Sequence, residues 1–417
     1  MSEPIKRPKR KNPILRTRAP TLPPDRRSRV ALGLVRGAAL GRLELQRCAG
    51  CGAIQYPPRE ACVRCLSEEL EWTVMSGAGE LVSETTLHHS QELFFRERTP
   101  WRLGLVRLAE GVSLVVHLDE RCGPAPSPVT VEAVLDRAGQ AALVAKPAGR
   151  DTSLADEPKL RDMTSDPRFR KVLVTDAKSP VGQAVVKAVL EAGADLVWAG
   201  HCEPWKNPPG WADIARLPKA TLVPLDVTDT KSVNELAGEL GFKVDIIINT
   251  AEHHRTFGLF GRTGVETARA EMETNCFGLL RLAQAFGPVM QSRGADGASS
   301  AVAWVNLLSI YALSNFPQHA TYSASMAAAL SVSQALRAEM RHAGIRVINM
   351  FPGPIDDEWN QLLPPPKLAP ASLAQAIVKA LRDGVEDVYP GDVAQEWLAR
   401  WRENPKVLER ELAAGGA

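Results

Sequence analysis

The sequence predicts a multidomain protein in which a zinc ribbon and a small β-barrel precede a doubly wound, parallel α/β sheet. Two CxxC pairs near the N-terminus predict the ribbon, and about five short strand patterns after them predict the barrel. Beyond residue 170, strand and helix patterns alternate along the 417-residue chain. The expected parts are a basic disordered tail (1–29), a helix with ribbon and barrel (30–146), a linker (147–170) and the α/β domain (171–417).

Composition narrows the possible classes of protein. Hydrophobic residues make up 45% of the chain, charged residues 24%, and the formal net charge is +2. No apolar run reaches the roughly 18 residues of a membrane-spanning helix, and the basic, Pro-rich start lacks the apolar segment of a signal peptide. The sequence therefore predicts a cytoplasmic protein with no membrane association. The basic tail is a solvated arm or an arm that docks to an acidic partner.

The first chemical motif is CxxC-x10-CxxC, formed by Cys48, Cys51, Cys62 and Cys65. Each CxxC presents two thiolates from one tight turn, and two such turns close a tetrahedral zinc site with Zn–S distances of about 2.3 Å. Four thiolates leave no position open for water or substrate, so a structural zinc is expected. A ribbon that keeps its fold without metal is the alternative. A redox CxxC fits less well, because two pairs suit one shared ion.

A β-rich stretch follows the cysteines. Five short strands joined by tight turns suggest a small barrel of the OB type. The expected strands are 77–85, 102–108, 112–118, 129–135 and 141–145, and a helix is expected at 30–40, before the ribbon.

Residues 30–146 resemble the zinc-ribbon/OB-fold family once catalogued as domain of unknown function 35 and associated with acyl-CoA metabolism and thiolases. The phrases Leu45-Gln46-Arg47-Cys48, Pro57-Pro58-Arg59, Glu71-Trp72 and Ser76-Gly77-x-Gly79 carry the resemblance. It implies a non-catalytic accessory module that acts beside acyl-CoA chemistry and associates with a thiolase-like enzyme.

The second half reads as strands followed by helices. Such alternation predicts a parallel, doubly wound sheet. The expected strands are 172–175, 196–199, 221–225, 244–249, 302–308 and 346–351, and the expected helices are 181–192, 267–290 and 322–342.

This half resembles the short-chain dehydrogenase/reductase family, in five motifs that occur in the family's order. They are Leu225-Asp226-Val227, Asn249-Thr-Ala-Glu252, Asn275-Cys-Phe-Gly278, Ser309 thirteen residues before Tyr322, and Pro352-Gly353. The resemblance implies that Ser309, Tyr322 and Asn275 occupy the catalytic positions and that Gly182, Asp226 and Asn249 occupy the cofactor site. It also implies an oligomer, because the helix that carries Tyr322 packs against a second subunit in this family.

Two departures from the family pattern bear on activity. Met326 stands where the family has a Lys that lowers the pKa of the Tyr, so Tyr322 is expected to stay a protonated phenol. The glycine-rich loop keeps only Gly182: Asp176 places a carboxylate where the pyrophosphate binds, and Pro180 removes an N–H donor. Two unit charges 4 Å apart repel by roughly 4 kcal/mol at an effective dielectric near 20. Since Lys178 offsets part of this repulsion, weakened NAD(P) binding is expected.

These observations favour a non-catalytic scaffold subunit of an acyl-CoA-processing complex, a pseudoenzyme that binds zinc. Its expected partners are a thiolase-like enzyme, an intact short-chain dehydrogenase subunit, or both, with acyl-CoA as a candidate ligand. One alternative is an NADP-dependent ketoreductase acting on 3-oxoacyl-CoA, and another is a catalytic use of Ser309 and Tyr322 without a nucleotide. A single-stranded nucleic-acid-binding role for the barrel would need stacking aromatics and a basic groove. The Phe94, Phe95 and Trp101 cluster is explained as well by packing.

Overall fold

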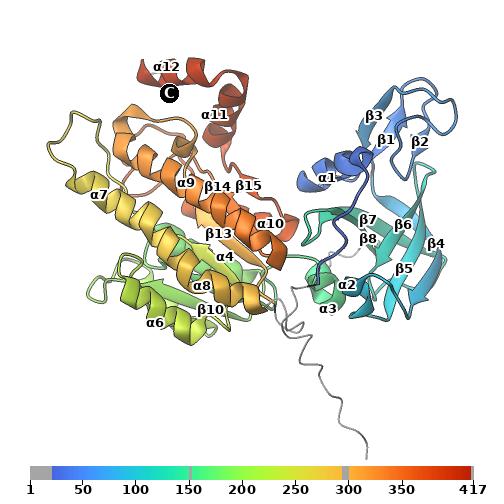
Figure 1. Ribbon diagram of the computed structural model, residues 1–417, viewed down its shortest axis with the longest axis horizontal. Helices are drawn as coiled ribbons and strands as arrows, with labels where there is room; N and C mark the ends of the chain where they lie inside the picture. Colours follow the sequence, from blue (N-terminus) through green and yellow to red (C-terminus); the bar gives the residue numbers. More distant parts are fainter. Residues whose placement is uncertain (1–20, 150–152, 294–299, 415–417) are drawn as a thin grey trace, which may run out of the picture.

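The computed structural model describes residues 21–149, 153–293 and 300–414, and it contains two halves that contact each other (Figure 1). The first half holds the ribbon and the barrel, and the second holds the α/β sheet. Most of the predicted basic tail, residues 1–20, lies outside the described residues.

The ribbon begins after a short helical segment, η2 (Arg29–Ala31) with α1 (Leu32–Ala39). Strands β1 (Glu44–Cys48), β2 (Ile54–Gln55) and β3 (Leu70–Val74) form an antiparallel sheet in the order β2-β1-β3. Both cysteine pairs lie in the loops of this sheet, since Cys48 ends β1 and the second pair falls between β2 and β3.

The barrel closes in the order β4-β5-β6-β8-β7. Its inner face is set by residue alternation: along β6, Leu114, Val116 and Leu118 are buried, while the residues between them are more exposed. An interior filled by side chains in this way is typical of a small barrel. The strands are β4 (Ala78–Leu87), β5 (Trp101–Leu108), β6 (Ser113–Leu118), β7 (Ser127–Leu135) and β8 (Ala141–Pro147), with α2 (Leu93–Arg96) between β4 and β5.

The segment expected as a linker packs against the barrel. It contains two helical turns, η3 (Leu154–Asp156) and α3 (Pro158–Arg161). Leu154 and Leu160 are buried in a cluster with Phe94 and Trp101. These aromatic residues therefore serve as core, because the helical turns cover the rings that base stacking would need.

Among the described residues, seven parallel strands form the sheet of the second half, in the order β11-β10-β9-β12-β13-β14-β15. The central strands are continuously apolar because helices cover both faces. The strands are β9 (Lys171–Val174), β10 (Leu196–His201), β11 (Ala220–Pro224), β12 (Ile246–Asn249), β13 (Ala303–Leu307), β14 (Arg346–Met350) and β15 (Asp387–Val388). The two-residue β15 was not predicted.

Helices lie on both faces of this sheet (Figure 1), and each face packs its own hydrophobic cluster. On one face pack α6 (Thr230–Leu240), α8 (Leu279–Arg293) and α9 (Ala320–Met340), joined by α11 (Asp392–Glu403) and α12 (Pro405–Ala413). On the other face pack α4 (Pro180–Glu191), α5 (Trp211–Arg216) and α10 (Pro370–Asp383). The predicted fold class is confirmed, whereas α6 was missed by the sequence analysis.

The long helical pattern predicted over 267–290 is interrupted. It consists of α7 (Glu266–Met272), a π-helical segment η4 (Glu273–Gly278) and α8. π-Helical segments inside longer helices are frequent at functional sites. Within the described residues, every helix is too short or too polar to cross a membrane.

Candidate functional site

The four thiols of the ribbon converge on one point. Their Sγ atoms all lie within 4.8 Å of one another. Cys48 Sγ is 3.5 Å from Cys65 Sγ, and Cys51 Sγ is 3.6 Å from Cys62 Sγ. A tetrahedron with Zn–S bonds of about 2.3 Å has edges of about 3.8 Å, so this donor set fits zinc in both chemistry and size.

A pair of buried glutamines positions the second cysteine loop. Gln55 Nε2 donates to Gln46 Oε1 at 3.0 Å, and Gln55 Oε1 accepts the backbone N–H of Val63 at 3.0 Å. The backbone N–H groups of Cys65 and Arg64 lower the pKa of Cys62 to about 6, whereas hydrogen bonds with the other thiols raise the pKa of Cys65 to about 12. The four thiols therefore share their protons unevenly, and Cys62 is the first to reach the thiolate form that binds metal.

In the second half, polar side chains gather at the carboxyl ends of the parallel strands. Asn249 ends β12, Ser309 follows β13, and Tyr322 lies on α9. Ligands of doubly wound sheets bind in the crevice outside the carboxyl ends of the strands.

Tyr322 is buried, and its hydroxyl donates a hydrogen bond to Glu252 Oε1 at 2.9 Å. Burial and the Glu252 carboxylate together raise the pKa of Tyr322 well above its ordinary value. The phenol is therefore neutral, and its proton is directed at a side chain of the same protein. The sequence analysis had not anticipated this contact.

Two histidines complete the surroundings of the phenol. The imidazole of His254 stacks on the Tyr322 ring with centroids 3.8 Å apart, and His254 Nε2 lies 2.5 Å from His319 Nδ1. His254 Nδ1 is 3.5 Å from Glu252 Oε1. Burial, with a contribution from His254, lowers the pKa of His319 to about 3, so His319 is neutral at physiological pH.

Met326 lies one turn after Tyr322 on α9 and is 1% exposed, packed within the apolar cluster on that face of the sheet. Its thioether brings no positive charge to the phenol, so nothing at this position opposes the rise in the pKa of Tyr322.

Ser309 lines the same small cavity as Tyr322 and Glu252, so the structure brings the predicted Ser and Tyr together. Ser309 Oγ accepts the backbone N–H of Tyr311 at 3.3 Å and begins the short helix η5 (Ile310–Ala312). The cavity volume is about 10 Å³, which is about one probe sphere and holds at most a single water.

Asn275 lies in the π-helical segment and binds its neighbours through all of its amide groups. Its Oδ1 accepts the N–H of His253 at 2.8 Å, and its Nδ2 donates to the His253 carbonyl and to Ser325 Oγ, at 2.9 and 2.8 Å. In this arrangement the Asn275 side chain holds the loop that contains His253 against α9.

The predicted phosphate loop is closed by local contacts. The N-terminus of α4 is capped by Ser179, whose Oγ accepts the N–H of Gly182 at 3.0 Å, and Pro180 occupies the first turn. A Cβ atom at Gly182 would lie 1.8 Å from the carbonyl oxygen of Asp176, so this glycine is required for packing. Burial raises the pKa of the Asp176 carboxyl.

Lys178, the cation of this loop, contacts residues outside the loop. Lys178 Nζ donates to the carbonyl of Glu203 and lies 5.3 Å from the centroid of the Trp211 ring. A capped helix start, a carboxyl group and an engaged lysine leave few free donors, so the loop as folded does not fit a pyrophosphate well.

The remaining predicted cofactor residues also satisfy local backbone and side-chain groups. Asn249 Oδ1 accepts from Thr175 Oγ1 at 2.8 Å, which links β12 to β9. Asp226 Oδ1 accepts from the N–H and the hydroxyl of Thr228, at 2.9 and 2.7 Å.

Sequence reasoning missed the roles of Glu252, His254 and His319. Glu252 is the last residue of the Asn249-Thr-Ala-Glu252 motif, where the family has a glycine, but its carboxylate reaches the Tyr322 hydroxyl. The one available signal was the replacement of a family glycine by an acid. The His253-His254 doublet matches no motif that would have drawn attention to it.

Fold and site together define a class: a doubly wound nucleotide-binding fold with a Ser/Tyr pair at its switch-point crevice, fused to a four-cysteine ribbon and a barrel. The family comparisons agree with this class. Residues 170–366 match the short chain dehydrogenase family. Residues 36–71 match the rubredoxin-like zinc ribbon domain of ChsH2, and residues 72–136 match its C-terminal OB-fold domain.

Similar proteins match the second half. An uncharacterized oxidoreductase of Staphylococcus haemolyticus is 30% identical over 218 residues, which is 51% of this chain and 90% of that protein. A short chain dehydrogenase of Burkholderia cenocepacia, solved in complex with NADP, is 32% identical with a TM-score of 0.53, covering 59% of this chain and 98% of that one.

A structure described as a short-chain dehydrogenase, from Novosphingobium aromaticivorans, shares the fold at 18% identity and a TM-score of 0.51, covering 58% of this chain and 87% of that one. The chain therefore belongs to the short-chain dehydrogenase family through its second half and carries the ribbon and OB-fold domains of the ChsH2 type in its first. The ribbon family and the four-cysteine cluster together support zinc as its metal.

Proposed function

We propose that this protein is a non-catalytic accessory subunit of an acyl-CoA-processing complex. The ribbon-and-barrel half would dock a thiolase-like enzyme, and the dehydrogenase-like half would support the assembly as a homo- or hetero-oligomer. The combination of ChsH2-type domains with a short-chain dehydrogenase domain fits an acyl-CoA-associated protein. The observation that carries the non-catalytic part is the hydrogen bond from Tyr322 to Glu252 in a cavity of about 10 Å³.

The chemical argument concerns proton donation. A reductase Tyr must donate its proton to the substrate oxygen, and it does so best with a pKa near the working pH. The Tyr322 proton is committed to a carboxylate, and burial raises the pKa of Tyr322 further from that range. A carbonyl substrate would have to displace Glu252 and enlarge the cavity before it could accept the proton.

The predicted site residues then take structural roles. Cys48, Cys51, Cys62 and Cys65 would hold a zinc ion that fixes the ribbon for docking. In this proposal six inherited positions now serve packing and local hydrogen bonds: Asn275, Ser309 and Tyr322 from the catalytic set, and Gly182, Asp226 and Asn249 from the cofactor set.

Two measurements on the full chain test this proposal. Calorimetry with NADPH should give no saturable heat up to about 1 mM, equivalent to a binding free energy weaker than about −4 kcal/mol. Native co-purification should recover a thiolase-like enzyme, and Cys51→Ser should abolish that recovery because it removes a zinc ligand. Turnover of a 3-oxoacyl-CoA with NADPH by the purified chain would refute the proposal.

A second candidate is an NADP-dependent ketoreductase acting on 3-oxoacyl-CoA, with Tyr322 as proton donor and Ser309 as its aide. One observation favours it: the 32% identical Burkholderia structure is in complex with NADP. It predicts saturable NADPH binding and turnover that Tyr322→Phe abolishes. Neither result is compatible with the accessory role alone.

A further inference from the structure

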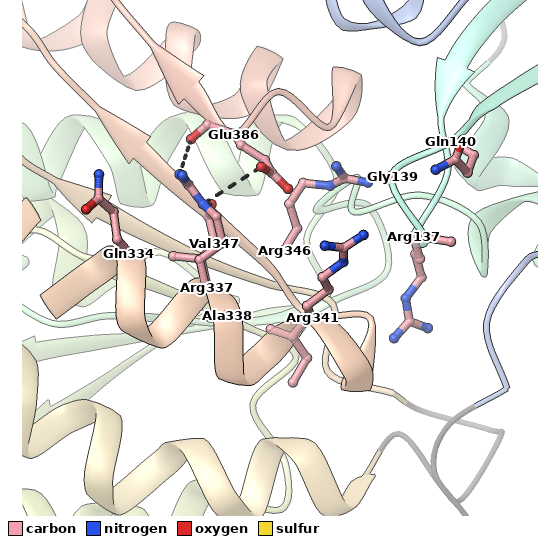
Figure 2. Close-up of a pocket in the computed structure, with 12 residues that line it drawn as sticks. Arg137, Gly139, Gln140, Gln334, Arg337, Ala338, Arg341, Arg346, Val347 and Glu386 are labelled. Carbon is pink, nitrogen blue, oxygen red and sulfur yellow. Dashed lines mark hydrogen bonds and ion pairs between the residues drawn. The ribbon is translucent and has the colours of Figure 1, made fainter. Parts of the chain in front are cut away.

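A second cavity lies where the two halves meet, away from the Tyr322 crevice. Its volume is about 420 Å³, within the usual range for small-molecule sites. The β7–β8 turn of the barrel supplies one wall, and the C-terminal part of α9 with β14 supplies the other (Figure 2). Its charged lining consists of Arg137, Arg337, Arg341, Arg346 and Glu386.

Arg137 ties the two halves together through uncharged acceptors. Its guanidinium donates to the carbonyls of Gly344, Ala301 and Ala343, and at 2.7 Å to Ser300 Oγ. Within the described residues no carboxylate lies within ion-pair distance of it. Burial, with the nearby Arg170, lowers the pKa of Arg137 to about 9, so at neutral pH it remains a buried cation.

Arg346 faces the same junction and is also buried. Its Nη1 donates to the Gly384 carbonyl at 2.7 Å, and its Nη2 donates across the junction to the Asp136 carbonyl at 2.5 Å. Its Nε is buried and has no hydrogen-bond partner among the described residues. Burial lowers the pKa of Arg346, whereas the carboxylates of Glu386 and Asp136 favour its charged form. Asp136 Oδ1 also accepts the N–H groups of Ala138 and Gln140.

The other arginines differ in how far they are neutralised. Arg337 donates to Asp387 Oδ1 at 2.6 Å and lies 3.8 Å from Glu386. Arg341 is exposed and makes no side-chain hydrogen bond or ion pair in the part of the chain that the structure describes. Figure 2 shows Arg341 and Arg346 on one wall and Gln140 on the opposite turn.

Gln140 adds an acceptor to this basic pocket. Its Oε1 is buried without a hydrogen-bond partner in the described residues, although it lines an open cavity. A buried acceptor without a partner costs free energy, as does a buried donor such as Arg346 Nε. Both residues line the same cavity, and a rotation of each side chain would bring its unpartnered atom within reach of one ligand.

We propose that this junction pocket binds a nucleotide with at least two phosphate groups, held by Arg341 and Arg346, with Gln140 accepting from a hydroxyl or amine of the nucleoside. Guanidinium groups suit phosphate oxygens because their N–H groups match them in geometry and charge. The ligand bridges both halves and would hold them in one arrangement. The nucleotide portion of CoA and a free nucleoside diphosphate share this chemistry. The inference does not depend on the accessory function proposed above.

Calorimetry on the full chain at low salt tests the site with CoA, ADP and inorganic pyrophosphate as probes. CoA or ADP should bind saturably, and the affinity should fall about tenfold in Arg341→Gln, since one charged hydrogen-bond partner is lost. Arg341 is exposed, so folding should be unaffected. Arg402→Gln, a matched change of an exposed arginine on α11, should bind like the wild type. Tighter binding of CoA than of ADP identifies CoA as the ligand source, and the reverse identifies a free nucleotide.

A further variant separates this pocket from the dinucleotide crevice. Lys178→Gln alters the loop that precedes α4 at the dinucleotide crevice, and it should leave the binding of CoA and ADP at the junction pocket unchanged. The proposal is overturned if none of the probes binds, if Arg341→Gln and Arg402→Gln bind alike, or if Lys178→Gln alone weakens binding. Equal affinity for pyrophosphate and both nucleotides would overturn the role of Gln140 as a nucleoside contact.

Discussion

Tyr322 and Glu252 are joined by a hydrogen bond of 2.9 Å inside the small cavity that Ser309 also lines. The two residues stand 70 positions apart in the sequence. The bond directs the phenolic proton to a carboxylate, and the His254 ring stacked on the phenol closes the other side.

Restoring two of the family's residues should strengthen cofactor binding. The double variant Glu252→Gly, Met326→Lys removes the competing carboxylate and supplies a cation, so NADPH affinity should rise about tenfold or more over the wild type. NADPH fluorescence titration measures this. Met326→Leu, which conserves volume, is the control and should bind no better than the wild type. Tight NADPH binding by the unmodified chain would contradict the role assigned to Glu252.

The stability of the protein should fall at alkaline pH through Tyr322. Its folded-state pKa is raised above the ordinary value of 10.0 by burial and by Glu252. The unfolded state therefore releases the proton first, and stability present below pH about 10 is lost as the pH rises further. In urea unfolding, Tyr322→Phe should lose less free energy of unfolding between about pH 9 and 11 than the wild type. Equal losses of the free energy of unfolding in the two proteins would show that Tyr322 ionises near its ordinary pKa in the folded state.

The barrel should weaken at acidic pH through His117. Burial, with a contribution from Arg27, lowers the pKa of His117 to about 4, and its Nδ1 accepts from Trp101 Nε1 at 3.0 Å. A depressed folded-state pKa means that stability is present above pH about 6.5 and is lost as the pH falls towards 4. The loss from this group should reach about 1–2 kcal/mol at pH 5.

Urea unfolding at neutral and acidic pH measures this loss. His117→Gln should show a smaller dependence on pH than the wild type. His89→Gln, a change of an exposed histidine, should behave as the wild type does. An equal pH dependence in His117→Gln would assign the acid sensitivity to other groups.

Removal of zinc should unfold the ribbon. The purified chain should contain about one zinc ion per molecule, and Cys62→Ser should lower this content and expose the ribbon to protease, because three thiolates hold the ion less tightly. Elemental analysis and limited proteolysis provide the readouts. Cys202→Ser, a change of an exposed cysteine far from the cluster in sequence, should keep the metal. Full zinc content in Cys62→Ser would exclude Cys62 as a ligand.

The two halves should separate when Arg137 is replaced. Its guanidinium makes four hydrogen bonds to groups of the second half. Arg137→Met should destabilise the fold by about 2–4 kcal/mol, since buried carbonyls lose their donor. Differential scanning calorimetry should then show two transitions in place of one. Arg402→Met is the control, and an unchanged single transition in Arg137→Met would mean that other contacts hold the halves together.

Local sequence patterns determined the fold class and the metal. The spacing of the four cysteines and the alternation of strand and helix patterns are short-range features, so they could be read directly, and the confirmed ribbon, barrel and parallel sheet follow from them. The absent Lys at Met326 and the lost glycines at Asp176 and Pro180 were equally local. The two-residue β15 was missed because two residues carry no periodicity, whereas α6 was missed although its buried residues Val233, Leu236, Ala237 and Leu240 recur at helical spacing.

Tertiary structure alone decided which distant groups meet. Glu252 reaches Tyr322, and Arg137 binds the carbonyl of Gly344, which is 207 positions away. No periodicity encodes such contacts, because they depend on how the sheet brings loops together and on how the barrel turn packs against β14. The sequence by itself therefore determined the fold class and the four zinc ligands, whereas packing decided that the phenol is sequestered and that arginines collect at the junction.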